Sequence, residues 1–579
     1  MKQLILGNEA VARGLYEAGC SFVSSYPGTP STEITEAIAK YPEVYAEWAP
    51  NEKVAMEAAF GASLAGRRSF CGMKHVGLNV AADPLFTISY TGVNAGMVIA
   101  VADDAGMHSS QNEQDSRHYA RAAKIPMLEP SDSAEALAFT KLAYELSEKF
   151  DTPVLLKMCT RVSHSQSVVE TGERVECVKE YQKDIAKYVM MPGNAKKRHP
   201  VVENRTQMLV EYAETAPINT VEAGACSDIG IITSSTSYQY VKEVCGEKYP
   251  VLKLGMIWPL PVKKIRDFAA SVKKLVVVEE LEGFIECHCR DLGLDCVGKE
   301  YFSNIGELMP LDVAEKLAKT WKTGVKLEEN IPPRPPVMCA GCPHRGLFYI
   351  LKKNKITVLG DIGCYTLGAV APLAAVDSVI CMGASVSGLH GFSKSQQGAA
   401  DGNTVAVIGD STFMHSGITG LVNIAYNESN ATVIIVDNSI TGMTGHQQNP
   451  TTGFNLKGDP CAKIDLETLC RSVGIRRVRV VDPYDLAACE TAIKEELAAN
   501  EPSVIISRRP CALLKYVKHK APVVVDENKC VGCKACMKIG CPAVSIVDGK
   551  AKIDNTLCVG CGVCQQLCKV GAMTAAKED

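Results

Sequence analysis

The sequence predicts several α/β domains with parallel sheets, followed by a small α+β domain at the C-terminus. Two observations carry this prediction. Short runs of Val, Ile, Leu and Ala alternate with segments of helical period through most of the 579 residues, which is typical of parallel strands joined by helices. Eight of the 25 cysteines lie between Cys530 and Cys568, and cysteines at such density usually bind metal. One hydrophobic core cannot serve a chain of this length, so several domains are expected.

The composition excludes several classes of protein. With 46% hydrophobic and 22% charged residues, the chain is neither disordered nor fibrous. A net charge of −4 offers no basic surface for nucleic acid. There is no run of 18 apolar residues, and the first residues lack the apolar stretch of a signal peptide. We therefore expect a cytoplasmic protein with reduced thiols and with neither membrane nor nucleic-acid partners.

The elements of the first half divide it into two α/β domains. Residues 1–165 contain the predicted strands SFVSSYPGTP, GMVIAVADD and TPVLLKM and the predicted helix NEKVAMEAAFGASLAG. Residues 166–220 are polar and irregular, and we expect a linker with a helix. Residues 221–330 form the second domain, with strands at 229–235 and 274–280. A stiff connector that cannot be helical follows, at Pro332, Pro333, Pro335 and Pro336.

The second half predicts a third α/β domain and the cysteine-rich module. Residues 331–520 contain the strands TVLGD, SVICMG, TVAVIGD, TVIIVD and SVIISR. Ligands of such parallel sheets bind at the carboxyl ends of the strands. Residues 521–579 consist of two similar halves, DENKC…CPAVSI and DNTLC…CKVGAM, and each half supplies one group of cysteines.

The cysteine spacing in these halves is that of bacterial-type ferredoxins with two [4Fe–4S] clusters. Because the fourth ligand is exchanged between halves, one cluster is assigned Cys530, Cys533, Cys536 and Cys568, and the other Cys558, Cys561, Cys564 and Cys541. The run departs from the usual pattern by an extra residue before Cys541 and by Lys569 in place of proline. The alternatives are zinc or free buried thiols, although zinc sites favour ligands in two pairs.

A second site is predicted where two strands of the third domain end. Gly409-Asp410-Ser411 follows one strand and Asp437-Asn438 the other, which resembles the thiamine diphosphate motif GDG…NN with Ser411 and Asp437 as departures. Mg²⁺ prefers hard oxygen ligands, and Asp410, Asn438 and the Ile440 carbonyl supply three. The helix after Asp410 directs its N-terminus at the phosphates, and a glycine-rich segment with Gly383 and Ser385 allows close backbone approach. The alternative is a plain α/β turn with an acidic strand end.

Thiamine enzymes also need a glutamate that binds N1′ of the aminopyrimidine, from a separate domain. Glu52 stands before an Ala- and Gly-rich helix in the first domain, where such enzymes place it. A glutamate at a helix start is otherwise a solvated cap.

These features together resemble the 2-oxoacid:ferredoxin oxidoreductases over nearly the whole chain. Tyr26-Pro27-Gly28-Thr29-Pro30-Ser31 is similar to their YPITPS segment, which implies that Thr29 contacts the substrate carboxylate and thiazolium region. The order of domains is also similar: pyrimidine-binding (1–165), transketolase-C-like (221–330), diphosphate-binding (331–520) and ferredoxin (521–579). The segments MKHVGLNVAADP, DDAGMHSSQNEQDSR, CAGCPHRG and MTGHQ resemble the large α subunits of members that oxidise arylpyruvates.

The resemblance implies a reaction and its partners. An arylpyruvate (indolepyruvate, and also phenylpyruvate-type acids), coenzyme A and two oxidised ferredoxins would give aryl-acetyl-CoA, CO₂ and two reduced ferredoxins. Because the γ-type domain of the family is missing, a smaller β subunit is expected, in an (αβ)₂ hetero-oligomer. No GxGxxG follows a strand, so neither NAD nor flavin is expected in this chain.

The family also implies a third [4Fe–4S] cluster beside the thiamine. The matching cysteines are Cys339, Cys342, Cys364 and Cys511. The alternative is that Cys339 and Cys342 line the diphosphate pocket with His344, while the other two are ordinary buried thiols. His344 is the best candidate among the histidines for a diphosphate contact, and His75 and His415 could shape the substrate pocket. For the substrate carboxylate the sequence offers Lys74 and Arg117 as cations.

Three other functions fit parts of the sequence. The first is the same chemistry on another 2-oxoacid, branched-chain or pyruvate. The second is a non-oxidative thiamine decarboxylase or synthase with a vestigial ferredoxin module. The third is an electron carrier whose α/β domains are only a scaffold.

Overall fold

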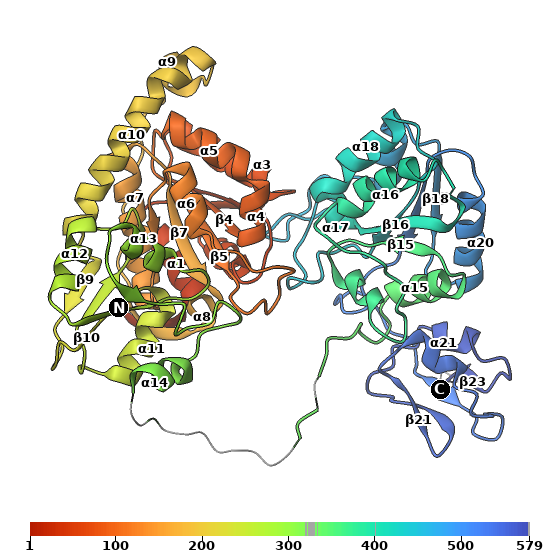
Figure 1. Cartoon of the computed structure of the whole chain (residues 1–579). Helices are drawn as coiled ribbons and strands as arrows, with labels where there is room; N and C mark the ends of the chain where they lie inside the picture. Colours follow the sequence, from red (N-terminus) through yellow and green to blue (C-terminus); the bar gives the residue numbers. More distant parts are fainter. Residues whose placement is uncertain (319–320, 322–329, 333, 400, 577–579) are drawn as a thin grey trace. The chain divides into compact units, whose positions relative to one another are not determined.

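The structure is a computed structural model, and its chain divides into two compact units, residues 1–327 and 328–579. Figure 1 shows the elements of each unit. The structure describes residues 1–318, 321, 330–332, 334–399 and 401–576. Pro333, one of the four connector prolines, lies outside the described residues.

The first unit contains a seven-stranded sheet in the order β12-β6-β7-β5-β4-β2-β3. All neighbouring strands are parallel except β12, which is antiparallel to β6. Central strands such as β5 are fully buried because apolar residues face both layers of helices. The strands are β2 (Phe22–Ser25), β3 (Tyr45–Trp48), β4 (Ser69–Lys74), β5 (Met97–Asp103), β6 (Met127–Leu128), β7 (Val154–Cys159) and β12 (Met256–Trp258). The three strands and the helix predicted for residues 1–165 are confirmed.

Helices connect these strands, and side-chain caps fix where several of them begin. Asn51 caps the helix that starts at Glu52, and Asp132 caps the helix that starts at Ser133. The helices are α1 (Gly7–Glu17), α2 (Thr32–Ile38), α3 (Glu52–Leu64), α4 (His75–Val80), α5 (Ala82–Thr91), α6 (Arg117–Ala123), α7 (Ser133–Phe150) and α8 (Thr160–His164).

A five-stranded sheet in the order β14-β13-β10-β11-β9 completes the first unit. It packs into one buried hydrophobic cluster with residues of the larger sheet. The strands at 229–235 and 274–280 are confirmed as β10 and β13. The strands are β9 (Asn219–Glu222), β10 (Ile229–Thr233), β11 (Val251–Leu254), β13 (Lys274–Val278) and β14 (Cys296–Val297), and the helices are α11 (Ser235–Cys245), α12 (Val262–Ala270), α13 (Phe284–Asp291) and α14 (Pro310–Leu317).

The segment expected to be a linker with a helix contains that helix, and its first residues form a strand that was not predicted. Its first residues form β8 (Gln166–Glu170), which pairs antiparallel with β1 (Lys2–Leu6). A short helix α9 (Ile185–Tyr188) and the 24-residue helix α10 (Pro192–Thr215) follow. Arg205 of α10 is buried and donates to the carbonyls of Ser89 and Asp151. Pairing and burial with distant segments thus order a polar stretch.

The second unit is built on a parallel five-stranded sheet in the order β15-β16-β17-β19-β18. Four of the five predicted strands are confirmed, but SVICMG is wrong: residues 378–383 form only one isolated bridge, between Leu359 and Ser378. The strands are β15 (Thr357–Leu359), β16 (Thr404–Gly409), β17 (Thr432–Asp437), β18 (Arg477–Val481) and β19 (Ser503–Arg508). The helices are α15 (His344–Lys353), α16 (Ala384–Ser395), α17 (Asp410–Thr412), α18 (Ile418–Tyr426), α19 (Leu466–Ser472) and α20 (Leu486–Leu497), with further turns at η1 (Cys364–Ala369), η2 (Asp401–Asn403) and η3 (Phe413–Gly417).

The cysteine-rich module at the end of the second unit repeats one small motif. Each half contributes a cysteine-bearing loop, a short helix and strands that pair antiparallel. Its elements are β20 (Val523–Val525), η4 (Ala535–Ile539), β21 (Val544–Val547), β22 (Lys550–Ile553), α21 (Val563–Gln566) and β23 (Met573–Ala575). The predicted fold class, parallel α/β sheets with a C-terminal α+β module, is confirmed. None of the helices in the described ranges is long and apolar enough to span a membrane.

Candidate functional site

In the first unit, candidate residues gather where four neighbouring strands end. β5, β4, β2 and β3 are adjacent and parallel, so the residues after their carboxyl ends meet at one edge. Thr29 follows β2 and is half-buried, and Glu52 follows β3. His75 follows β4 and Asp104 follows β5. The fold thus brings the two predicted catalytic residues to the same edge.

Glu52 is not a solvated helix cap. It is 5% exposed, although it is the first residue of α3. Gly77 of α4 lies directly against it, since a Cβ at Gly77 would come within 2.5 Å of Glu52 Oε1. Gly77 therefore packs against the buried Glu52 carboxylate more closely than a residue with a side chain could.

Lys74 and Arg117 differ sharply as partners for a substrate carboxylate. Arg117 is fully buried and committed, because it pairs with Asp115 and Glu279 and donates to the carbonyls of Glu280 and Glu282. Arg117 thus joins α6 to the smaller sheet, and its guanidinium is occupied by these partners.

Lys74, in contrast, ends β4 beside the Thr29 segment. Its Cβ lies 3.2 Å from where a Cβ on Gly28 would be. Its Nζ donates to the carbonyl and hydroxyl of the exposed Ser109, at 2.6 and 3.2 Å, and lies 3.9 Å from Asp104. Burial lowers the pKa of Lys74 to about 8. Ser109 Oγ also donates to the Thr29 carbonyl at 3.4 Å, so one exposed loop covers both residues.

The predicted histidines of the substrate region are buried. His75 Nε2 lies 3.2 Å from the Asn112 carbonyl, and its Nδ1 has no hydrogen-bond partner in the described structure. Burial lowers the pKa of His75. In the second unit, His415 is buried with its Nδ1 2.6 Å from Ser416 Oγ.

In the second unit, three oxygen-bearing groups converge where β16 and β17 end. They are the Asp410 carboxylate, the Asn438 amide and the Ile440 carbonyl. One of the two terminal atoms of the Asn438 amide, which can be its oxygen or its nitrogen, lies 3.3 Å from Asp410 Oδ1 and 2.6 Å from the Ile440 oxygen. If the nitrogen occupies this position, the amide donates hydrogen bonds to both oxygens. If the oxygen occupies it, three oxygens face one another with no hydrogen bond between them. With the amide oxygen in that position, the three groups offer the hard oxygen ligands that Mg²⁺ prefers.

The surroundings of Asp410 match a cation site. Asp410 is 2% exposed, and burial together with the nearby Asp437 raises its pKa to about 7. Thr451 donates to its Oδ2 at 3.1 Å, and Thr441 donates to Ser411 at 2.9 Å. No cationic side chain pairs with Asp410 among the described residues. The departure from the usual motif at Asp437 has a structural reason, because Asp437 pairs with Arg508 of β19 at 2.8 Å.

The predicted glycine-rich contact is organised by a residue that sequence reasoning missed. Asp361 is fully buried, and its carboxylate accepts from the backbone N–H groups of Gly383 at 2.9 Å and Ser385 at 3.0 Å. These two N–H groups are therefore already engaged, and a ligand would meet the Ser385 side chain or neighbouring backbone. Gly383 has φ +88°, and a Cβ there would lie 2.6 Å from Ser416 Cβ, so glycine is required for this close approach.

His344 begins α15 and is 4% exposed. Its ring meets the edge of Tyr365, with ring centroids 6.0 Å apart, and Tyr365 packs on Gly409 before Asp410. Burial lowers the pKa of His344 to about 4, so the imidazole is neutral near pH 7 and brings no charge to a diphosphate.

The four cysteines of the predicted third cluster come from three segments of the chain and lie near one another. The Cys342 thiol interacts electrostatically with those of Cys339 and Cys364, and the Cys364 thiol with those of Cys339 and Cys511. Burial raises the pKa of Cys342 to about 12 and that of Cys364 to about 11, and the neighbouring thiols add to this. Such a group becomes thiolate only around a cationic centre. The residues therefore fit a metal cluster.

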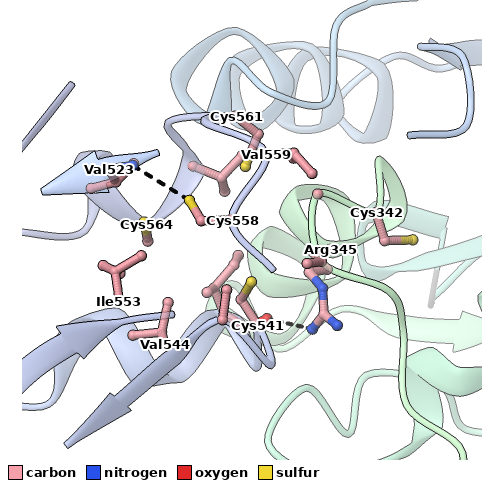
Figure 2. A pocket seen from close by; sticks show the side chains of 15 residues that line it. Cys342, Arg345, Val523, Cys541, Val544, Ile553, Cys558, Val559, Cys561 and Cys564 are labelled. Atoms are coloured by element: carbon pink, nitrogen blue, oxygen red, sulfur yellow. Dashed lines mark hydrogen bonds between the residues drawn. The ribbon is translucent and has the colours of Figure 1, made fainter. Parts of the chain in front are cut away.

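In the module, each set of four cysteines lines its own cavity. One cavity is lined by Cys530, Cys533, Cys536 and Cys568, and the other by Cys541, Cys558, Cys561 and Cys564. Figure 2 shows the second cavity, with Cys342 and Arg345 from the neighbouring domain at its wall. In each set the fourth cysteine comes from the other half of the repeat, as the ligand exchange requires.

Backbone groups are placed to stabilise thiolates in both cavities. The N–H groups of Ala551 and Ala572 donate to Cys530 and Cys568 sulfur at 3.4 and 3.2 Å, and that of Val523 to Cys558 at 3.4 Å. Among the described residues, no three His, Cys, Asp or Glu side chains are gathered to hold a single metal ion.

Comparison with known proteins places these sites in context. Residues 13–224 match the thiamine diphosphate-binding domain of pyruvate flavodoxin/ferredoxin oxidoreductases, residues 361–507 the C-terminal TPP-binding domain of thiamine pyrophosphate enzymes, and residues 551–574 a 4Fe–4S binding domain. The chain is 39% identical to the indolepyruvate oxidoreductase subunit IorA of Archaeoglobus fulgidus, over 100% of this chain and 98% of that protein. It is 40% identical to the subunit of the same name from Thermococcus kodakarensis, over 99% and 97%.

Among solved structures, the 2-oxoglutarate:ferredoxin oxidoreductase from Magnetococcus marinus is similar over 55% of this chain and 64% of that chain. The TM-score is 0.47 and the sequence identity 19%.

Proposed function

The chain belongs to the family of the indolepyruvate oxidoreductase IorA subunits, and we propose on this basis that it oxidises arylpyruvates with coenzyme A. It is a thiamine diphosphate-dependent 2-oxoacid:ferredoxin oxidoreductase. In the proposed reaction an arylpyruvate, CoA and two oxidised ferredoxins give aryl-acetyl-CoA, CO₂, two reduced ferredoxins and one proton. The bond between carboxylate and keto carbon breaks, a thioester forms, and two electrons leave one at a time.

One observation supports this function more than any other. The second unit holds both a strand edge where three oxygen-bearing groups converge and two cavities lined by four cysteines each. A decarboxylase that releases an aldehyde has no use for one-electron carriers, whereas an enzyme that passes electrons to ferredoxin needs them.

The residues take the following proposed roles. Thiamine diphosphate, when bound, supplies the nucleophilic carbon and the electron sink for decarboxylation. Asp410, Asn438 and the Ile440 carbonyl hold Mg²⁺ at its diphosphate, next to Ser411, while Gly383, Ser385 and the neutral His344 line the same region. Glu52 binds the aminopyrimidine nitrogen and Thr29 the substrate. The third cluster is held by Cys339, Cys342, Cys364 and Cys511.

We also propose the partners that the relatives' names imply. A smaller β subunit would complete an (αβ)₂ enzyme, and ferredoxin would take the electrons in the cytoplasm. The two module clusters then form the exit path from the thiamine site.

A substrate panel tests the choice of 2-oxoacid. With viologen as acceptor and the partner subunit present, we expect indolepyruvate and phenylpyruvate to show a kcat/KM at least about 10-fold above pyruvate and branched-chain acids, because an aromatic ring buries more apolar surface. Omission of CoA should suppress turnover. A preference for pyruvate would reject the arylpyruvate assignment while leaving the reaction type intact.

Lys74 is the cation that we propose for the substrate carboxylate. Its replacement by methionine should lower kcat/KM for the 2-oxoacid by about 10- to 100-fold, the loss of one charge-assisted hydrogen bond. The pKa of Lys74 is lowered to about 8, so its charge is present below pH 8 and is lost as the pH rises. We therefore expect kcat/KM to fall above pH 8 in the wild type.

The arginine variant is the matched control for Lys74. Since arginine stays protonated, Lys74→Arg should remove the fall above pH 8 while retaining part of the activity. A wild-type profile that is flat between pH 7 and 9.5, with Lys74→Met as active as the wild type, would show that another group binds the carboxylate.

A further inference from the structure

Arg345 is a buried cation at the boundary between the diphosphate-binding domain and the cysteine-rich module. It lies in the first turn of α15, three residues after Cys342, and is 4% exposed. Figure 2 shows its side chain beside Cys541 and the segment of Cys342. Together with Cys342, it lines the cavity that Cys541, Cys558, Cys561 and Cys564 surround.

Among the described residues, only backbone carbonyls accept hydrogen bonds from this guanidinium. On the domain side, Nε donates to the Cys339 carbonyl at 3.1 Å and another nitrogen donates to that of Met338. On the module side, it donates to the carbonyls of Ile539, at 3.2 Å, and Gly540. Arg345 thus ties the Cys-x-x-Cys segment of one domain to the cysteine loop of the other.

No carboxylate compensates this charge. In the described part of the chain Arg345 forms no ion pair, and the groups that act on it electrostatically are the thiols of Cys541, Cys342, Cys339 and Cys561. A buried unpaired charge is costly and is normally paired. The missing negative charge is what thiolate-ligated clusters would supply at both of its sides.

The module loop that holds Arg345 contains the departure noted in the sequence. The spacing Cys536-x4-Cys541 has one residue more than the usual run of three. The two residues before Cys541 are Ile539 and Gly540, whose carbonyls accept from Arg345. Gly540 has φ +67°, a conformation that glycine adopts without strain. The longer loop therefore presents two carbonyls to the guanidinium.

The other cavity of the module has no such group. Its wall includes Lys534, which is exposed, and Lys550 donates to the Cys530 carbonyl from a half-buried position. Charges in contact with water are screened, whereas a buried charge acts at low effective dielectric. Arg345 should thus affect its own cavity much more than either lysine affects the other.

We propose that Arg345 is the positioning residue that sets the reduction potential of the cluster held by Cys541, Cys558, Cys561 and Cys564 and fixes that cluster against the Cys339–Cys342 segment. Reduction adds one negative charge to a cluster, so a buried positive charge beside it favours the reduced form. We call the cluster of Cys541, Cys558, Cys561 and Cys564 the inner cluster and the other module cluster the outer one. The electron then rests on the inner cluster before it passes to the outer cluster. This inference depends on the proposed cluster assignment.

The test is a potentiometric titration of the anaerobically purified enzyme with its partner subunit, followed by electron paramagnetic resonance. The outer cluster, of Cys530, Cys533, Cys536 and Cys568, is the internal reference, and its signal is identified with a Cys533→Ser chain. In Arg345→Gln we expect the equilibrium constant for electron transfer from the inner to the outer cluster to rise about tenfold, a potential change of about 59 mV for one electron. The outer potential should not move.

Two further variants separate charge from packing. Arg345→Lys keeps the charge and should leave the inner potential close to that of the wild type. Lys534→Gln removes an exposed charge at the outer cavity and should shift that cluster less than Arg345→Gln shifts the inner one. An unchanged inner potential in Arg345→Gln, or an equal shift in Arg345→Lys, would overturn the proposal.

Iron analysis distinguishes a failure of the Arg345 proposal from a failure of the cluster assignment on which it depends. If Arg345→Gln does not retain its clusters, the lysine variant decides: a wild-type inner potential supports the proposal and a lowered one overturns it. Fewer than about eight iron atoms per wild-type chain would instead refute the cluster assignment itself.

Discussion

Replacement of Asp410 by alanine is expected to abolish 2-oxoacid oxidation, with kcat/KM reduced by about 10³-fold or more. Asp410 contributes the only carboxylate to the three oxygen-bearing groups that converge at the ends of β16 and β17. Loss of an outer contact to a metal ligand alone costs about 10- to 100-fold, and loss of the ligand itself should cost more. Without the cation, the diphosphate loses the charge that holds it.

The fold should survive this substitution. Asp410 is buried, and its pKa is raised to about 7 by burial and by Asp437, so removal of its charge relieves repulsion. Bound thiamine and magnesium should fall from about one per chain to near zero, whereas the iron content stays unchanged. Thiamine, magnesium and iron are measured after anaerobic gel filtration, and viologen reduction is measured on the same samples.

Asp437→Asn is the matched control for this experiment. It restores the usual Asn-Asn pair and removes the charge that Asp437, itself buried, shares with the half-buried Arg508, while the three oxygen-bearing groups stay in place. Thiamine binding and turnover should persist. Full activity in Asp410→Ala would contradict the site and would favour the interpretation of the α/β domains as a scaffold.

Much of this architecture could be predicted from local sequence. The runs TVAVIGD and TVIIVD became β16 and β17 because apolar, β-branched residues form buried parallel strands. SVICMG has a similar composition but is not a strand. Ile380 is 70% exposed there, and the chain turns through Gly383 into α16 instead of pairing along β15.

The parts that could not be predicted depend on contacts between distant segments. Asp361 binds the backbone of Gly383 and Ser385 from 22 and 24 residues away. Arg345 binds carbonyls near residue 540. No local pattern marks either residue. Likewise, residues 166–170 were expected to be part of a linker. They form a strand because they pair with residues 2–6, which are far away in the sequence.

The choice between Lys74 and Arg117 shows the same limit. Both are buried cations in the expected region of the sequence, and only their partners separate them. Arg117 is bound on all sides by Asp115, Glu279 and two carbonyls, whereas an exposed loop covers Lys74.

Replacement of the exchanged cysteines is expected to remove one module cluster at a time and to stop ferredoxin reduction. Cys541→Ala and Cys558→Ala lie in different halves of the repeat but line one cavity, so both should cost about four iron atoms per chain from the same cluster. Cys568→Ala and Cys530→Ala should cost the other. Ferredoxin reduction should fall by about 10²-fold or more in each, because the exit path is broken.

Electron paramagnetic resonance spectra show which cluster is lost in each variant. Cys461→Ala, at an exposed cysteine outside all three proposed sets, is the matched control and should keep its iron. If Cys541→Ala lost the cluster of the Cys530 half instead, the ligand exchange would be wrong. Undiminished ferredoxin reduction would show that the module is not on the electron path.

The central claim is that electrons from a 2-oxoacid enter the clusters of this chain. The most direct test adds indolepyruvate and CoA, without external acceptor, to the oxidised wild-type enzyme and its partner under anaerobic conditions, and records the cluster signals by electron paramagnetic resonance. We expect reduced-cluster signals together with CO₂ and indoleacetyl-CoA, and no such signals in Asp410→Ala. Release of CO₂ and an aldehyde while the clusters stay oxidised would contradict it.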